Sequence, residues 1–244
     1  MPPVRALDGS FTILGGRVPR VVFLLLGLTL LATILAAVGY RNGLPFFLRA
    51  TTLSPALVWE GQLWRLVTWP FVELGGAPPG LNLFFGCLLL VFLGRDLYYA
   101  WGATRFLGHY LGIAAASGLA TCLVSRLWSD VWASDYFTMW PAVDAMIIAW
   151  ATLHPGREIL IFLVLPARGR TLIIATIALT LLFALLSGFT YFVPHFLAEG
   201  LMLAYLNQPT GLRRFWQQAR RRRSQRRASK LRVVERDEPP RWLH

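Results

Sequence analysis

The sequence has few charged side chains and almost no cysteine. Asp, Glu, Lys and Arg make up only 15% of its 244 residues, while 56% are hydrophobic. A soluble domain of this length needs more charge to cover its surface, so the composition indicates a membrane protein with several spanning helices. Both cysteines, Cys87 and Cys122, lie in apolar runs. They indicate small buried thiols and give no sign of a disulfide or metal framework, and no motif calls for a cofactor.

Acidic residues are scarce: 12 Asp and Glu stand against 24 Lys and Arg, a net charge of +12. Much of the excess lies after residue 212. The cluster there follows the last apolar run directly and includes Arg220, Arg221, Arg222, Arg223, Arg226 and Arg227. Such a cluster suits the anionic lipid headgroups of an inner leaflet. Nucleic-acid binding is the minor alternative, because the cluster is tethered to a membrane, and a role only in setting topology is also open.

Six apolar segments predict an all-α bundle of six transmembrane helices, since about 20 apolar residues cross a bilayer. The expected helices cover residues 21–40, 81–99, 105–126, 138–153, 171–187 and 194–206. A signal peptide is the alternative for the first, but its apolar run is longer than a signal core. A seven-residue run, 159–165, is too short to span. No internal repeat is evident, which argues against an inverted-repeat transporter.

The placement of Lys and Arg predicts that both termini are cytoplasmic. Residues 1–20 then form a basic cytoplasmic leader, 21–206 the membrane domain and 207–244 a basic cytoplasmic tail. Within the membrane domain, residues 41–80 are rich in Pro and Trp and too apolar for a free aqueous loop. We expect short helices half-embedded in the outer interface, where tryptophan rings settle. The Arg- and Ala-rich character suits a bacterial inner membrane, with a eukaryotic endomembrane as the alternative.

Residues 82–120 read as a helical hairpin. A polar stretch, 94–105, separates its two apolar arms, and the second arm carries a ladder of small residues: Gly112, Ala114, Ala115, Ala116, Ser117, Gly118 and Ala120. Small residues on a membrane helix let another backbone approach closely. We therefore expect this hairpin to be the central packing unit of the bundle.

Several segments, in this order, resemble the rhomboid superfamily of intramembrane serine proteases and their inactive relatives, including the derlins. A Trp-Arg-Leu-Val-Thr segment begins at Trp64 and Arg65. A Gly-Arg-Asp-Leu segment with a following Trp-Gly comprises Gly94, Arg95, Trp101 and Gly102, and the run 159–166 ends in Pro. The resemblance covers about residues 58–206 and implies a six-helix rhomboid-like bundle.

The protease positions implied by this resemblance have lost their chemistry. Trp140 stands where the nucleophilic serine is expected, and no serine lies between Ser134 and Ser187. The His-x-x-x-Asn motif that helps to form the oxyanion hole is replaced by Asn82 and Gly86. On the last helix, either His195 with a gap or Phe196 without one takes the place of the catalytic histidine. Serine proteolysis needs a nucleophile, a base and oxyanion donors together, so we expect no serine protease.

Three polar residues nevertheless fall inside predicted helices. Asp144 lies four residues after Trp140, and His195 and Glu199 are also four apart, so each pair shares a helix face. If the helices meet as in rhomboids, Asp144, His195 and Glu199 form one buried polar cluster. The cluster is either a structural hydrogen-bond network or a functional site. Its composition is a weak metal signal, and no metal is predicted.

The sequence thus predicts a non-proteolytic pseudoenzyme that binds transmembrane segments of client proteins or other membrane partners. One alternative is an endopeptidase or other hydrolase using Asp144, His195 and Glu199. Another is a proton-coupled transporter or channel that depends on Glu199.

Overall fold

The computed structural model describes residues 10–13, 16–75, 80–161 and 165–207. The chain divides into two units, 1–206 and 207–244. The arginines of the predicted tail, 220–223, 226 and 227, lie outside the described residues, as does the start of the basic leader.

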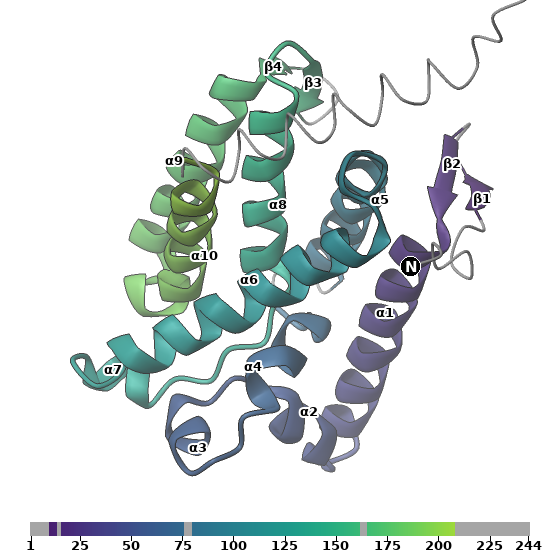
Figure 1. The fold of residues 1–244 in the computed structure, drawn as a ribbon. Coiled ribbons are helices and arrows are strands. Elements are labelled where there is room, and N and C mark those ends of the chain that lie inside the picture. Colours follow the sequence, from purple (N-terminus) through teal and green to yellow (C-terminus); the bar gives the residue numbers. More distant parts are fainter. Residues whose placement is uncertain (1–9, 14–15, 76–79, 162–164, 208–244) are drawn as a thin grey trace, which may run out of the picture. The chain divides into compact units, whose positions relative to one another are not determined.

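Helices account for most of the described chain (Figure 1). The six long ones are α1 (Arg20–Arg41), α5 (Leu81–Trp101), α6 (Ala103–Val124), α8 (Trp140–Leu153), α9 (Gly169–Ser187) and α10 (Phe189–Asn207). Shorter helices fill the connections: α2 (Phe46–Thr51), α3 (Pro55–Trp59), α4 (Arg65–Thr68), the 3-10 turn η2 (Trp69–Phe71) and α7 (Ser129–Trp132). Two antiparallel hairpins, which the all-α prediction omitted, pair β1 (Ser10–Ile13) with β2 (Gly16–Pro19) and β3 (Glu158–Ile161) with β4 (Leu165–Arg168).

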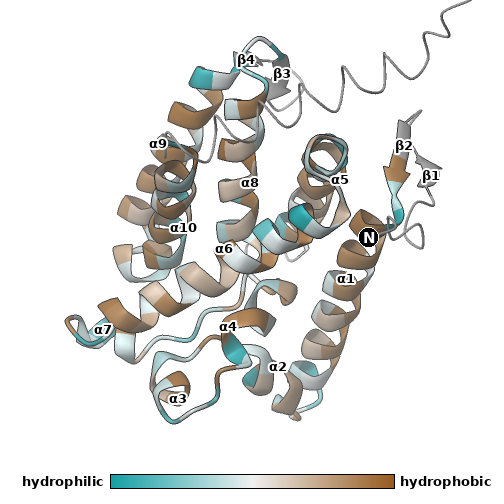
Figure 2. Cartoon of the chain, viewed as in Figure 1, coloured by the Kyte–Doolittle hydropathy of each residue, from teal (hydrophilic) through white to brown (hydrophobic). Residues whose placement is uncertain are grey.

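Among the described residues, four helices are long and apolar enough to cross a membrane: α1, α5, α6 and α9. Each buries one stripe and leaves apolar side chains exposed on its other side, as a helix facing lipid does. Figure 2 shows the resulting predominance of hydrophobic residues along these helices. The protein is therefore a polytopic, mostly helical membrane protein. Helix α10 is not among these four, and the apolar helix α8 has only 14 residues, about 21 Å at 1.5 Å per residue, which is shorter than a bilayer core.

Helix α8, and not the predicted hairpin, is the most enclosed element. Twelve of its fourteen residues are buried, and it contacts α5, α6 and α9. In Figure 1 it runs between α5 and α9. Its sequence has a hydrophobic residue at almost every position, which suits a helix surrounded by protein on all sides.

The hairpin is tighter than its polar residues suggested. Residues 94–101 continue α5, and Gly102 alone separates α5 from α6. Gly102 has a φ of 84° and donates its N–H to the Tyr98 carbonyl at 2.7 Å. Because only glycine adopts this backbone conformation without strain, Gly102 sets the point at which the chain reverses.

The small residues of α6 receive side chains of the outer segment instead of another helix backbone. The indole N–H of Trp69 donates to the Ala114 carbonyl at 3.3 Å, and that of Trp59 donates to the Cys122 carbonyl at 3.1 Å. A Cβ at Gly118 would lie 3.2 Å from the Trp69 indole nitrogen. The small residue Gly118 does admit a close neighbour, but that neighbour is a tryptophan side chain, and the contacts hold residues 53–72 against the bundle.

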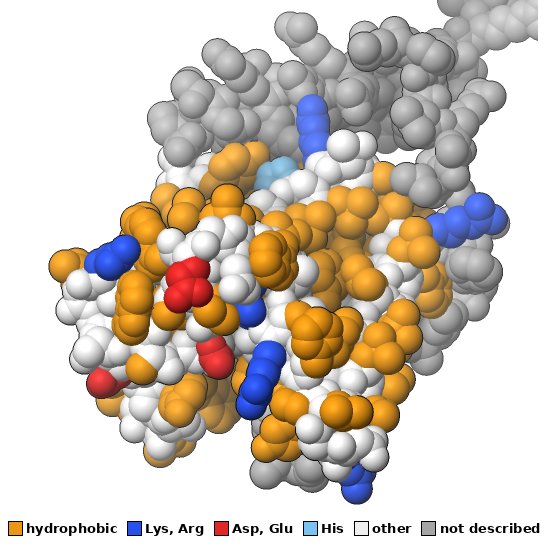
Figure 3. All heavy atoms as spheres, turned by 90° about the horizontal axis from the view of Figure 1, so that it is seen from below, with side chains coloured by type: hydrophobic (Ala, Val, Ile, Leu, Met, Phe, Trp, Pro, Cys, Tyr) orange, Lys and Arg blue, Asp and Glu red, His pale blue; other side chains and the backbone are white. Residues whose placement is uncertain are grey.

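Arg65 organises the outer segment from within. It is buried and donates through Nη1 to the carbonyls of Arg49 and Thr52 at 2.6 and 2.7 Å, and through Nε to Gln62 at 2.8 Å. The neighbouring Trp64 donates to the Ala50 carbonyl at 3.2 Å. The short helices expected here are present. Large apolar side chains are exposed on this end of the molecule, among them Leu44, Phe46, Leu63 and Trp64, and Figure 3 shows hydrophobic groups spread over it.

Helix α10 begins five residues earlier than predicted, so that Pro194 lies inside it. A proline has no N–H for the carbonyl four residues before it. Here that carbonyl, of Thr190, accepts a hydrogen bond from the Tyr136 hydroxyl at 3.1 Å. The helix therefore continues through the proline without leaving its carbonyl unpaired.

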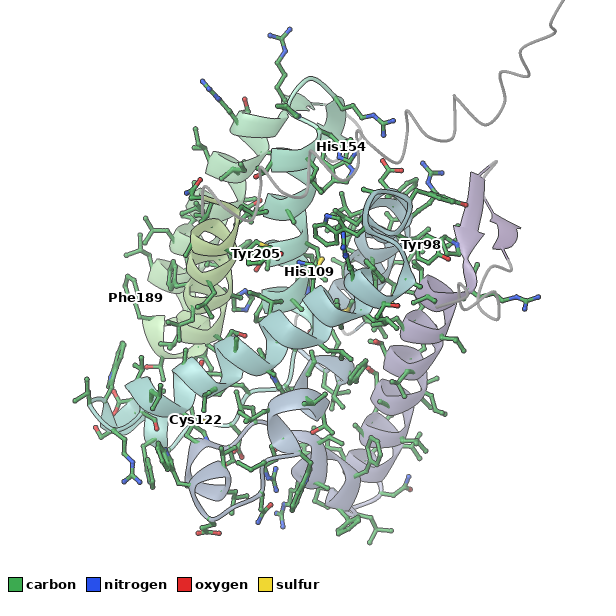
Figure 4. All side chains as sticks on the ribbon, viewed as in Figure 1. Tyr98, His109, Cys122, His154, Phe189 and Tyr205 are labelled. Atoms are coloured by element: carbon green, nitrogen blue, oxygen red, sulfur yellow. The ribbon has the colours of Figure 1, made fainter. Side chains whose placement is uncertain are left out.

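Near its other end, α10 is joined to α6. Nε2 of His109 lies 3.1 Å from the Tyr205 hydroxyl, and the His109 ring stacks on Trp101 at a centroid distance of 4.4 Å. Figure 4 shows His109 and Tyr205 close together between the two helices. This contact holds the end of α10 against α6, and the basic tail follows in the sequence.

Candidate functional site

The rhomboid resemblance places the nucleophile at the start of α8. In the structure, the Glu73 side chain binds the first residues of this helix. Oε2 of Glu73 accepts hydrogen bonds from the Thr138 hydroxyl at 2.5 Å and from the Met139 N–H at 3.1 Å. The Thr138 hydroxyl in turn accepts from the Trp140 N–H at 3.2 Å. A carboxylate at this position satisfies free N–H groups and favours the positive end of the helix. Glu73 thus caps α8 from a distant segment.

Glu73 itself is held from two sides. Its side chain is buried, and its own N–H donates to the Thr33 hydroxyl of α1 at 3.1 Å. Burial raises the pKa of the Glu73 carboxyl, although the hydrogen bonds from Thr138 and Met139 oppose the shift. The segment 71–73 therefore connects α1 to the beginning of α8.

On α5, Gly86 stands at a position that the resemblance assigns to the oxyanion-hole motif, and the Met139 side chain occupies the space beside it. A Cβ at Gly86 would lie 2.7 Å from the Met139 sulfur, so the absence of a side chain at Gly86 is what admits Met139. Trp140 is partly buried, and its indole N–H is buried without a hydrogen-bond partner among the described residues. Asn82 is partly buried at the first turn of α5, near Gly75. Because Gly86 has no side chain, its position supplies no side-chain donor for an oxyanion.

Asp144 and His195 form a direct pair. Oδ2 of Asp144 on α8 lies 2.7 Å from Nδ1 of His195 on α10, and both side chains are largely buried. His195 also packs against the ring of Phe192 at 5.0 Å. The next residue, Phe196, instead stacks on Phe189 at 6.4 Å. Of the two alternatives on the last helix, His195 is therefore the residue that faces α8.

Glu199 lies one helical turn beyond His195 and has a different partner. The Thr180 hydroxyl of α9 donates to Oε1 of Glu199 at 2.7 Å, and Glu199 is buried. It still lies near enough to Asp144 and His195 for their charges to act on it. The three predicted polar residues thus occupy one region, with one direct bond between Asp144 and His195. The described residues contain no group of three or more His, Cys, Asp and Glu side chains arranged to hold a metal ion.

The Gly-Arg-Asp-Leu segment that begins at Gly94, which resembles rhomboids, holds α5 against its neighbouring helices. A Cβ at Gly94 would lie 3.2 Å from the Phe106 ring, so the glycine lets α5 and α6 pack closely. Arg95 contacts its neighbour Asp96 at 3.4 Å. Asp96 also accepts from the Trp150 indole N–H of α8 at 3.2 Å and from Arg157 at 2.8 Å. This carboxylate ties α5 to the far end of α8.

Sequence reasoning missed Glu73, Thr138 and Thr180. Glu73 carried a signal: it is an acid between Val72 and Leu74, in a segment that had to be shielded from lipid. The two threonines carried none, because threonine is common in membrane helices and only the fold places them beside Glu73 and Glu199.

A family model described as eukaryotic integral membrane protein (DUF1751) matches residues 22–231. The chain belongs to the DUF1751 family. The match covers α1 from its third residue, the other five long helices in full, and part of the basic tail. The eukaryotic description of DUF1751 counts against the bacterial inner membrane expected from composition, while the multi-pass membrane assignment stands. A comparison with curated proteins gave no match.

Proposed function

We propose that this DUF1751 protein is a rhomboid-like, non-proteolytic membrane protein that binds transmembrane segments of partner proteins. The observation that carries the proposal is the start of α8, where Trp140 replaces the nucleophile and Met139 packs toward Gly86. The order of the six long helices supports the rhomboid-like part of the proposal, with both termini cytoplasmic in a eukaryotic membrane.

The helices on either side of α8 are the proposed binding elements. Helix α9 buries only a narrow stripe, made of Leu172, Thr176, Thr180 and Ala184 together with Gly169. Its other side exposes large apolar groups, including Leu179, Leu182 and Leu186. On α5, Phe92 is exposed in the same way. A partner helix between α5 and α9 would pack on apolar side chains and lie next to the polar region of α8 and α10.

Crosslinking in native membranes tests this proposal. A photo-crosslinking amino acid placed at Phe92 or Leu179 is expected to capture membrane proteins, whereas the same group at Leu31 on the exposed side of α1 serves as a control and should capture mainly lipid. Equal protein capture at all three positions would contradict a binding site beside α8. In proteoliposomes, the wild type and Trp140→Ser are both expected to leave transmembrane substrates intact, because one hydroxyl does not restore the oxyanion donors.

A second candidate, hydrolysis at a non-standard site, is favoured by the Asp144–His195 pair. A carboxylate that orients an imidazole is the arrangement by which a base activates water or a hydroxyl. The same proteoliposome assay separates the two functions. Cleavage by the wild type that is lost in His195→Ala and in Asp144→Asn would establish the hydrolase and refute the pseudoenzyme.

We also propose that the arginine-rich tail binds anionic headgroups. Its support is the sequence alone: Arg220–Arg223 with Arg226 and Arg227 follow the last apolar run closely, and each basic residue near a charged bilayer contributes about 1 kcal/mol.

A further inference from the structure

An arginine just past the end of α6 is held between two tryptophan rings. The guanidinium carbon of Arg126 lies 4.3 Å from the centroid of the Trp59 ring and 4.9 Å from the centroid of the Trp132 ring. Trp59 is the last residue of α3, and Trp132 is the last residue of α7. Helices α3, α6 and α7 contact one another at this end of the bundle (Figure 1). Together they build one site, the arginine clamp, which consists of Trp59, Arg126 and Trp132.

Both rings of the clamp are fixed by contacts that do not involve the arginine. The Trp59 indole N–H donates to the Cys122 carbonyl of α6 at 3.1 Å. Beside Trp132, the Val131 side chain is fully buried in the same hydrophobic cluster as Val58 of α3. The tertiary structure therefore provides the two aromatic walls, and the guanidinium lies between them.

The clamped arginine has hydrogen-bond donors to spare. Within the described part of the chain, Arg126 forms no ion pair, and its guanidinium donates to no protein acceptor. The faces of the two rings attract the cation electrostatically. A guanidinium carries five N–H donors in a planar fork that matches the oxygens of a phosphate. The clamp thus presents a positioned cation whose donors are available to an anionic group.

An apolar strip leads along α6 to the clamp. Leu119 and Leu123 are exposed one turn apart on this candidate membrane span, and Leu127, just past its end, is 92% exposed. The next residue, Trp128, is 38% exposed. Exposed leucines on a spanning helix face acyl chains, and tryptophan rings settle where the chains meet the headgroups. This placement puts the clamp at the headgroup boundary of the bilayer.

Two exposed carboxylates flank the clamp in the sequence. Glu60 directly follows Trp59, and Asp130 lies two residues before Trp132. Neither forms an ion pair with the arginine in the described structure. One fixed cation with two carboxylates nearby repels a ligand of net negative charge, but it complements a group that carries a phosphate and an ammonium together. A zwitterionic phospholipid headgroup has this pair of charges.

We propose that the arginine clamp binds one zwitterionic phospholipid, of the phosphatidylcholine or phosphatidylethanolamine class, from the leaflet that this end of the bundle faces. Arg126 donates to the lipid phosphate, and the carboxylates of Glu60 and Asp130 attract the ammonium. The acyl chains follow the apolar strip of α6, which is why the ligand is a lipid and not a free phosphate. This site is separate from the proposed partner site beside α8 and does not depend on it.

Native mass spectrometry of the full chain, released from detergent micelles, tests the proposal. Given equal amounts of phosphatidylcholine, phosphatidylglycerol and diacylglycerol, the wild type is expected to retain one phosphatidylcholine in preference to the other two. Arg126→Gln should lower this retention about tenfold, because the charge-assisted hydrogen bonds to the phosphate are lost. Arg126→Lys keeps the charge without the planar fork and should fall between them. Arg41→Gln, at an exposed arginine in the last turn of α1, is the matched control and should behave as the wild type.

The choice of headgroup separates lipid binding from a clamp that only stabilises the fold. Glu60→Gln combined with Asp130→Asn should raise the retention of phosphatidylglycerol relative to phosphatidylcholine by about fivefold, because two repulsive charges at the surface are removed. Both side chains are exposed, so thermal unfolding of the double variant should match that of the wild type.

Three results would overturn the proposal. The first is equal retention of phosphatidylcholine and diacylglycerol by the wild type, which requires no variant to fold. The second is wild-type retention of phosphatidylcholine in Arg126→Gln. The third is a headgroup preference that stays the same when both carboxylates are neutralised.

Discussion

Glu73 offers the sharpest test of how the bundle is held together. In Glu73→Ala, the Thr138 hydroxyl and the Met139 N–H lose their acceptor, and α8 loses its cap. Two hydrogen bonds and a buried unpaired donor together correspond to a loss of about 2–4 kcal/mol in the free energy of unfolding. Glu73→Gln keeps a carbonyl oxygen where Oε2 lies, so its loss is expected to be about 1 kcal/mol or less.

The two variants should also differ from the wild type in their pH dependence. Burial raises the pKa of Glu73 above its ordinary value of 4.5. The stability that this group contributes is therefore fully present below the unfolded-state pKa and is lost as pH rises through the folded-state pKa. Glu73→Gln removes that slope, because glutamine does not titrate. Relative to the wild type, Glu73→Gln should become more stable as the pH rises.

Denaturant unfolding in detergent micelles, followed by tryptophan fluorescence over a series of pH values, measures both effects. Glu60→Ala is the matched control, since Glu60 lies in the same outer segment but is exposed. The reasoning fails if Glu73→Ala unfolds at the wild-type denaturant concentration, or if Glu73→Gln loses as much stability as Glu73→Ala.

Three further predictions concern packing, the outer segment and the tail. Gly86→Leu should lower the free energy of unfolding by about 1–3 kcal/mol, because the added side chain collides with Met139. Adding Met139→Ala to Gly86→Leu should recover part of that loss. If the effects of the two substitutions on thermal unfolding simply add, Gly86 and Met139 are not in contact. Arg65→Gln should lower stability by about 2–4 kcal/mol, whereas Arg49→Gln, at an exposed side chain whose carbonyl persists, should not. Trypsin should cut the tail at residues 220–227 more slowly in anionic than in zwitterionic proteoliposomes, with the difference abolished by high salt; equal rates at low salt would rule out headgroup binding.

The sequence predicted the long helices well because their signal is local. An apolar run of about 20 residues is sufficient to place a membrane helix, and the expected bounds of α1, α5, α6, α8 and α9 lie close to the observed ones. The exception, α10, was started at Pro194 and not at Phe189. Proline is a valid reason to begin a helix, and only the fold reveals that Tyr136 satisfies the carbonyl that Pro194 leaves free.

Only part of the candidate site could be predicted. Residues that are unusual by themselves were found, whereas hydrogen-bond partners that lie far away in the sequence were not. Asp144, His195 and Glu199 were singled out because a charged residue in an apolar helix is unexpected by itself. Their partners were not predictable in this way. Glu73 lies 65 residues before Thr138 in the sequence, and Thr180 reaches Glu199 from α9 to α10.

The sequence by itself determined that this is a multi-pass membrane protein without a serine nucleophile at the start of α8. Both conclusions depend on residue type and short-range order, which every copy of the chain carries before it folds. Only the tertiary structure decided that α8 is the enclosed helix, that Glu73 caps it, and that His195 pairs with Asp144 while Glu199 pairs with Thr180. Those are choices between partners of similar chemistry, and they depend on which side chains the packed helices bring within hydrogen-bond distance.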